Sequence, residues 1–240
     1  MIFEDYYSRI VSVLDKIKNT QAEKIAEAAK IAANIIEHDG IIYIFGCGHS
    51  HLIALDAFYR AGGLANVSAM LDTDLMLHNG AAKSSKMEKL SGIAESVFER
   101  YNVTGNDMLI TVSTSGKNAV PTEMAITATK NKISNIAIVS SAYFEDGTKM
   151  PKLYECADMF IDNCVPHGDA VVDIAGSDAK MGSVSTVASS FIIQSILLEA
   201  AEISAEHGAK PPIYKSGNVD GGTEYNKELI ERYMPRIKHL

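Results

Sequence analysis

The side chains best suited to chemistry in this sequence are hydroxyls in two glycine-containing turns. The first turn follows the apolar run 41–45 and reads Gly46-Cys47-Gly48-His49-Ser50-His51. The second follows the apolar run 108–112 and reads Ser113-Thr114-Ser115-Gly116-Lys117-Asn118. Hydroxyls and the N–H groups of a helix N-terminus bind phosphate through charge-assisted hydrogen bonds without any lysine or arginine. The two turns therefore predict a phosphate site.

The spacing of the first turn argues against two common nucleotide motifs. A dinucleotide fingerprint needs a third glycine three residues after the second, where this chain has His51, and no P-loop lysine follows. Two simpler interpretations remain open. The first turn can be a plain connection between a strand and a helix, and Ser113 and Ser115 can merely cap the helix that follows them.

A third polar stretch lies at 163–183. It is long for a connection and holds several polar residues and glycines, which is typical of a functional loop. Those that we singled out are His167, Gly168, Asp169, Asp173, Lys180 and Gly182. Ser185 and Thr186 stand directly after it, at the start of an apolar helix predicted to be central.

Four residues could transfer protons. The candidate acids and bases are Glu88, His49, His78 and His167. The alternatives are that Glu88 lies on a solvated helix face and that His49 is a structural hydrogen-bond partner. His49, His51, His78 and His167 could also gather a zinc ion, but they lack tight ligand spacing, and the three cysteines have no C-x-x-C spacing. We therefore expect neither a metal nor a cofactor.

Alternating strands and helices must position these residues. Short apolar runs predict buried strands at 41–45, 67–71, 108–112, 136–139 and 159–161. Helical spacing predicts helices at 2–18, 21–37, 52–59, 84–101, 121–132, 183–203 and 223–238, with Thr20 as the N-cap of the second. This order predicts an α/β fold, a three-layer αβα sandwich around a five-stranded parallel, doubly wound, flavodoxin-like sheet. In such sheets ligands bind at the carboxyl ends of the strands.

Composition limits the range of partners. The chain has 240 residues, 47% of them hydrophobic, with a formal net charge of -8. One domain over 1–240 is expected, with a helical pair at 1–38, the sheet core at 39–205 and a tail with a helix at 206–240. The acidic balance argues against nucleic acid. We see neither a signal peptide nor an apolar run of about 18 uncharged residues, so we expect a cytoplasmic protein without a membrane partner.

Together, the two hydroxyl-rich turns resemble those of the sugar isomerase (SIS) domain family over about residues 35–205. The Gly46–His51 turn, the Arg60–Leu64 turn and the tail from its paired prolines to its paired glycines are similar to an uncharacterised bacterial single-domain branch. Gly168-Asp169-Ala170 and Ser185-Thr186 add to this likeness, and the branch is related to phosphoheptose isomerases and N-acetylmuramic acid 6-phosphate etherases. The resemblance implies a phosphosugar site formed by Gly46, Gly48, Ser50, Ser113, Thr114, Ser115, Ser185 and Thr186.

The resemblance also implies two classes of function. One is an enzyme of carbohydrate metabolism, an aldose–ketose isomerase or a related lyase or etherase, with Glu88, His49 and His78 as catalytic candidates. The other is a non-catalytic sugar-phosphate sensor or regulator that acts through a protein partner. Zinc-dependent heptose phosphate isomerases carry paired glutamates where this chain reads Phe58-Tyr59-Arg60-Ala61, and many relatives have Thr or Ser at the position of Asn118.

A homodimer or higher homo-oligomer is expected for two reasons. The resemblance implies sites completed by a neighbouring chain, and the apolar faces of the N-terminal helices exceed what a covered sheet can bury. The tail at 215–218 is the segment expected to reach across.

Overall fold

The computed structural model describes residues 1–145, 147 and 151–240. Its centre is a parallel five-stranded sheet with the order β2-β1-β3-β4-β5. The strands are β1 Ile42–Gly46, β2 Val67–Met70, β3 Met108–Val112, β4 Ser134–Val139 and β5 Met159–Asp162. The residues of β1, β2 and β3 are all buried, because helices cover both faces of the sheet. The five predicted strands and their parallel arrangement are confirmed.

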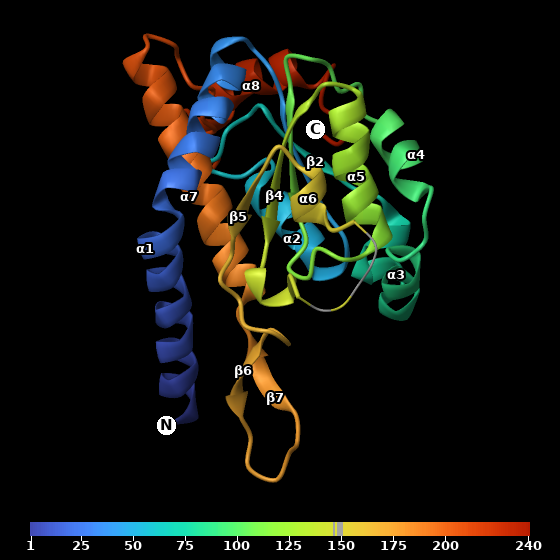
Figure 1. Cartoon of the computed structure of the whole chain (residues 1–240). Coiled ribbons are helices and arrows are strands. Elements are labelled where there is room, and N and C mark those ends of the chain that lie inside the picture. The colour runs from blue at the N-terminus through green and yellow to red at the C-terminus, as the bar shows by residue number, and fades with distance from the viewer. Residues whose placement is uncertain (146, 148–150) are drawn as a thin grey trace.

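Helices form the two outer layers of the sandwich (Figure 1). One face of the sheet packs against α1 Ile2–Glu37, α2 His51–Ala57 and α7 Ser185–Glu206. The other packs mainly against α4 Ile93–Glu99, α5 Ala119–Lys130 and α8 Gly222–Tyr233, with α3 Ala81–Met87 and α6 Leu153–Cys156 beside them. The predicted three-layer α/β sandwich is therefore confirmed.

The N-terminal region is one helix, so the prediction of two helices separated at Asn19-Thr20 is wrong. α1 runs through 36 residues without interruption. The Thr20 hydroxyl donates to the Lys16 carbonyl at 2.8 Å, one turn earlier, and does not cap a new helix. A threonine that bonds back in this way is satisfied inside a helix. Without Gly or Pro nearby, a possible cap is not enough to end a helix.

The predicted helix at 84–101 is divided into α3 and α4. Gly92 has a φ of +88° at the N-terminus of α4, a left-handed conformation that glycine adopts at little cost. The N–H of Gly92 donates to the Glu123 carboxylate at 2.8 Å, which ties this break to α5. As a result Glu88 follows the last residue of α3 instead of lying inside a longer helix.

The segment 163–183 contains a β-hairpin that we predicted only as a loop. The antiparallel strands β6 Ala170–Asp173 and β7 Lys180–Ser183 extend away from the sheet beside the first half of α1 (Figure 1). Tyr6 of α1 holds the hairpin, since its hydroxyl donates to the Ser183 carbonyl at 2.6 Å. Its ring also lies so close to Gly182 that a Cβ there would come within 2.9 Å.

The apolar helix α7 lies between α1 and α2. It has 22 residues, and an 18-residue window within it has a mean hydropathy of 1.4, so its length and composition alone would allow it to cross a membrane. In the fold it packs along α1 and contacts α2. Two of its polar residues have partners within the protein: Gln194 donates to Asp56 at 3.1 Å, and Ser195 donates to the Phe191 carbonyl at 2.8 Å. We therefore interpret α7 as a helix of the sandwich, with one face in the core and the opposite face exposed.

Candidate functional site

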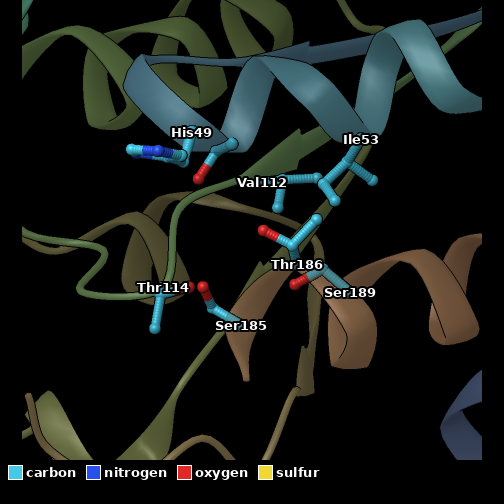
Figure 2. A pocket seen from close by; sticks show the side chains of 8 residues that line it. His49, Ile53, Val112, Thr114, Ser185, Thr186 and Ser189 are labelled. Carbon is cyan, nitrogen blue, oxygen red and sulfur yellow. The ribbon is translucent and has the colours of Figure 1, made fainter. Parts of the chain in front are cut away.

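A small cleft lies where the first turn, the second turn and the N-terminus of α7 meet (Figure 2). Its walls are formed by His49, Ser50, Ile53, Val112, Thr114, Ser185, Thr186 and Ser189. The two turns follow β1 and β3, which are neighbours in the sheet. The cleft therefore occupies the carboxyl edge, where doubly wound sheets bind ligands. Its volume is about 10 Å³, close to the space of one water molecule.

Two glycines shape the first turn. A Cβ on Gly46 would lie 2.5 Å from the Ser50 carbonyl oxygen, so only glycine lets Ser50 approach the end of β1 so closely. Gly48 has a φ of +56°. The N–H of Ser50 donates to the Cys47 carbonyl at 2.9 Å, which closes the turn. The two glycines thus determine the position of the hydroxyl of Ser50.

In the second turn, Thr114 is the hydroxyl residue that reaches the cleft. Ser113 is buried, and its Oγ accepts the Gly116 N–H at 3.3 Å, so it serves the turn itself. Ser115 is half-buried and does not line the cleft. The structure therefore brings together Ser50, Thr114, Ser185 and Thr186, whereas Ser113 and Ser115 do not line the cleft.

Asn163 organises two of the cleft hydroxyls, and sequence reasoning missed it. This buried residue follows β5, and its side-chain amide donates to Thr114 Oγ1 and to Ser189 Oγ, both at 3.3 Å. A hydroxyl that accepts a hydrogen bond keeps its own proton to donate. Thr114 and Ser189 can therefore act as donors toward an anion. The sequence feature that could have identified Asn163 is its position at the carboxyl end of a predicted strand.

Asp169 binds the beginning of α7; the sequence pointed to it as part of a functional loop but not as a residue of the phosphate site. Its carboxylate accepts the N–H of Val184 at 2.9 Å and the N–H and hydroxyl of Ser185 at 2.8 and 2.7 Å. The Ser185 proton is thereby committed to Asp169, so Ser185 offers an incoming ligand only acceptor capacity. Thr186 lies one residue further along the helix. The acidic residue after Gly168 was the signal in the sequence.

Glu88 lies between the two turns but does not line the cleft. It is half-buried; burial raises the pKa of its carboxyl group, and a hydrogen bond from Asn118 opposes this rise. Burial and the neighbouring Glu88 carboxylate also raise the pKa of the Cys47 thiol. These interactions place the carboxyl group near Cys47 of the first turn and Asn118 of the second. A carboxyl group with a raised pKa is suited to proton transfer near neutral pH.

The histidines are spread over different surroundings. His49 is exposed at the cleft, whereas His51 is buried and its Nδ1 contacts the Gly48 carbonyl oxygen. The exposed ring of His78 lies 6.1 Å from that of His51. His167 stacks on Tyr143 at 4.6 Å, away from the cleft lining. Within residues 1–145, 147 and 151–240, no group of three His, Cys, Asp or Glu residues is placed to hold a metal ion.

The comparisons with known proteins agree with this architecture. The model of the SIS domain matches residues 5–140. The UPF0309 protein of Caldanaerobacter subterraneus subsp. tengcongensis is 40% identical over 247 residues, which cover 100% of this chain and 99% of the relative. A phosphoheptose isomerase from Francisella tularensis has a similar structure, with a TM-score of 0.58 and 16% identity over 83% of this chain and 96% of its own.

A second similar structure is the Vibrio vulnificus NanR protein complexed with ManNAc-6P. Its TM-score is 0.51 with 14% identity, and the match covers 100% of this chain and 71% of that one. At such identities the two solved structures support the fold. The family model matches more than half of the chain, and the Caldanaerobacter relative is 40% identical over nearly its whole length. These two matches show that this chain belongs to the SIS domain family.

Proposed function

We propose that this protein binds a phosphorylated sugar at the cleft, with the phosphate held by Ser50, Thr114 and Thr186. The observation that carries the proposal is the convergence of short hydroxyl side chains from three elements at the carboxyl edge of the sheet. Asn163 orients Thr114 and Ser189 as donors. The first turn of α7 adds N–H groups beyond those of Val184 and Ser185, which Asp169 already accepts, together with the positive end of a long helix.

Family membership supports this ligand class. The NanR protein, which has the same fold, was solved with ManNAc-6P, a phosphorylated sugar. At 14% sequence identity, the particular sugar that NanR binds cannot be assigned to this chain. The cleft itself has little room, so we expect the phosphate to widen it and the sugar to lie outside, near exposed His49.

For catalysis we propose an aldose–ketose isomerase or a related lyase, with Glu88 as the acid–base residue and His49 as the second candidate. The raised pKa of the Glu88 carboxyl supports this role. One observation favours a different function, a non-catalytic sugar-phosphate sensor: Glu88 does not line the cleft. The purified protein can be tested with aldose, ketose and amino-sugar phosphates. Turnover would support the enzyme, and binding without turnover would support the sensor.

A thermal-shift measurement tests binding directly. A phosphorylated sugar at a hundredfold excess over its Kd stabilises the native state by about 2.7 kcal/mol. For a chain of this size the melting temperature should rise by about 5–10 °C. The unphosphorylated sugar should have almost no effect. If a broad panel of sugar phosphates shifts nothing, the proposed phosphate site is wrong.

Thr114→Val provides the matching variant, because it keeps the shape of the side chain and removes its hydroxyl. Losing one hydrogen bond to a charged group costs about 1.5–3 kcal/mol, so the affinity should fall by about ten- to a hundredfold. Thr122→Val is the control. Thr122 is a buried threonine of α5 outside the cleft lining, and its hydroxyl has no partner among the described residues. Equal losses in both variants would contradict the proposal.

A further inference from the structure

A second cavity lies on another part of the molecule and is much larger than the cleft. This groove has a volume of about 390 Å³, which lies within the usual range of small-molecule sites. It runs between the first half of α1 and the chain from the end of β5 into the hairpin. Its walls are Arg9, Ser12, Val13, Lys16, Cys164, Pro166, His167, Ala170, Val171 and Lys180. No residue lines both cavities.

The groove is positively charged although the protein is acidic. Arg9, Lys16 and Lys180 line it, and none of the described residues that line it is Asp or Glu. Three carboxylates lie near its walls: Asp5 pairs with Arg9 at 3.2 Å, Asp173 pairs with Lys180 at 3.1 Å, and Asp162 accepts the N–H of the lining residue Cys164 at 2.8 Å. The side chains of Asp5 and Asp173 are 46% and 80% exposed, so both ion pairs are weak and screened by solvent.

Lys16 adds a third cation to the groove wall. It has no ion-pair partner among the described residues, in contrast to Arg9 and Lys180. None of the described lining residues carries a carboxylate, and the Asp162 carboxylate is already held by Ser141 and the Cys164 N–H, so three cations face the cavity in a chain whose formal net charge is -8. A concave wall concentrates such a charge on whatever enters. The groove therefore favours an anion.

The spacing of the cations limits the length of that anion. Arg9 and Lys16 are seven residues apart on one face of α1, which corresponds to about 10 Å along the helix axis. Ser12 and Val13 lie between them, and Val171 and Pro166 add apolar surface on the opposite wall. A fitting molecule has an anionic group at each end and a compact middle. Arginine suits phosphate best, because its guanidinium can donate two parallel hydrogen bonds.

We propose that this groove is a second binding site, which takes a small metabolite with a phosphate at each end. Arg9 and Lys16 bind the two phosphates, and Lys180 of the hairpin contributes from the opposite wall. The proposal is independent of the sugar-phosphate cleft, because it uses different residues and a different kind of contact. Cations dominate here, whereas hydroxyls and N–H groups dominate in the cleft.

Calorimetric titration of the full chain with fructose 1,6-bisphosphate tests the groove, with inorganic phosphate as the reference probe. The bisphosphate should bind at least tenfold more tightly than inorganic phosphate, because two ends are held at once. Lys16→Gln and Arg9→Gln should each weaken its binding by about tenfold. Lys18→Gln is the matched control, since Lys18 is an exposed lysine of α1 that does not line the groove. It should leave the affinity unchanged.

Three outcomes would overturn the proposal: bisphosphate binding no tighter than that of phosphate, no effect of Lys16→Gln, or an equal effect of Lys18→Gln. The cleft variant Thr114→Val assigns the signal to one cavity. If bisphosphate binding is lost in Thr114→Val and kept in Lys16→Gln, the groove proposal fails and the cleft stands. The reverse pattern supports the groove and leaves the cleft to be judged by its own sugar-phosphate titration.

Discussion

Single residues decide what the cleft can bind, and the hydrogen-bond donors matter more than the number of hydroxyls. The sequence contains serines and threonines in both turns, but their contacts separate them by role. Thr114 accepts a hydrogen bond from Asn163, so its own hydroxyl is available as a donor. The hydroxyl of Ser185 already donates its hydrogen bond to Asp169. Residue type alone cannot predict this difference, because it depends on Asn163 and Asp169, which approach from other parts of the chain.

Glu88 carries the prediction for catalysis at this scale. Glu88→Gln keeps the shape of the side chain and removes the titrating group, so turnover of a sugar phosphate should fall by about 10²–10⁴-fold. Binding should remain, because Glu88 does not line the cleft. Steady-state kinetics and calorimetry on the same variant separate the two effects. Unchanged turnover would instead point to His49 as the acid–base residue.

The raised pKa of Glu88 also predicts a pH dependence of stability. In the folded state the carboxyl group keeps its proton above its ordinary pKa of 4.5, so between that value and the folded pKa the native state binds more protons than the unfolded state. Stability from this group is therefore present below pH 4.5 and is lost as the pH rises through the folded pKa. Denaturation curves should show wild type losing stability relative to Glu88→Gln across that window. A constant difference would show that the carboxyl group is not perturbed.

Among the elements, the hairpin meets α1 closely at Tyr6, which packs against Gly182. Gly182→Ala places a methyl group within 2.9 Å of the Tyr6 ring and also forces alanine to a φ of +81°. Gly176→Ala is the matched control, because its φ is +78° and nothing lies within 4 Å of the added methyl group. Both variants carry the left-handed strain of about 1–2 kcal/mol. Only the first disturbs Tyr6.

We therefore expect Gly182→Ala to release the hairpin from α1. Amide hydrogen exchange should accelerate over β6 and β7 in this variant and stay near the wild-type rate in Gly176→Ala, apart from the turn itself. The thermal stability should fall further in Gly182→Ala than in the control. Equal exchange in the two variants would mean that Tyr6 does not hold the hairpin.

The sequence predicted elements well where one pattern governs a segment. The apolar runs gave the five strands, because strands covered on both faces need continuous apolar residues. The predictions failed where a local signal was overridden by the rest of the chain. Thr20 could cap a helix but bonds to Lys16 inside one, and Gly92 divides a segment whose helical spacing is otherwise continuous.

At the scale of the whole molecule, contacts between distant segments were the least predictable. Arg232 donates to the Asp39 carboxylate at 2.7 Å, and Arg236 does so at 3.0 Å, which holds the C-terminal region against the turn before β1. The two arginines lie 193 and 197 residues from Asp39 in the sequence, so no local pattern links them. Asn163 in the cleft and Tyr6 at the hairpin also contact residues that are distant in the sequence. The resemblance to a family predicted where a candidate site should lie, but it did not predict these contacts.

An exposed apolar surface lies on α2 and α7. α2 and α7 pack together, and their outer faces carry Leu52, Leu55, Val187, Phe191 and Leu198, which are 38–67% exposed. The face adjoins the cleft, because both elements begin there. A second copy of this chain is the occupant that we propose, since a symmetric dimer would cover the face and place the two clefts near its edge. This proposal differs from the tail at 215–218, which we predicted from the sequence as the contact between chains.

Leu198→Glu tests this dimer, because Leu198 is the most exposed of these five residues at 67%, and a carboxylate in an apolar interface cannot be buried without a partner. At micromolar concentration, light scattering should give the mass of a homo-oligomer for the wild type and of a monomer for Leu198→Glu. Leu90→Glu is the matched control, since Leu90 is 50% exposed and lies after α3, outside this face. It should leave the oligomer intact. A monomeric wild type would exclude the dimer, and dissociation by Leu90→Glu as well would show that added charge alone, not this face, determines assembly.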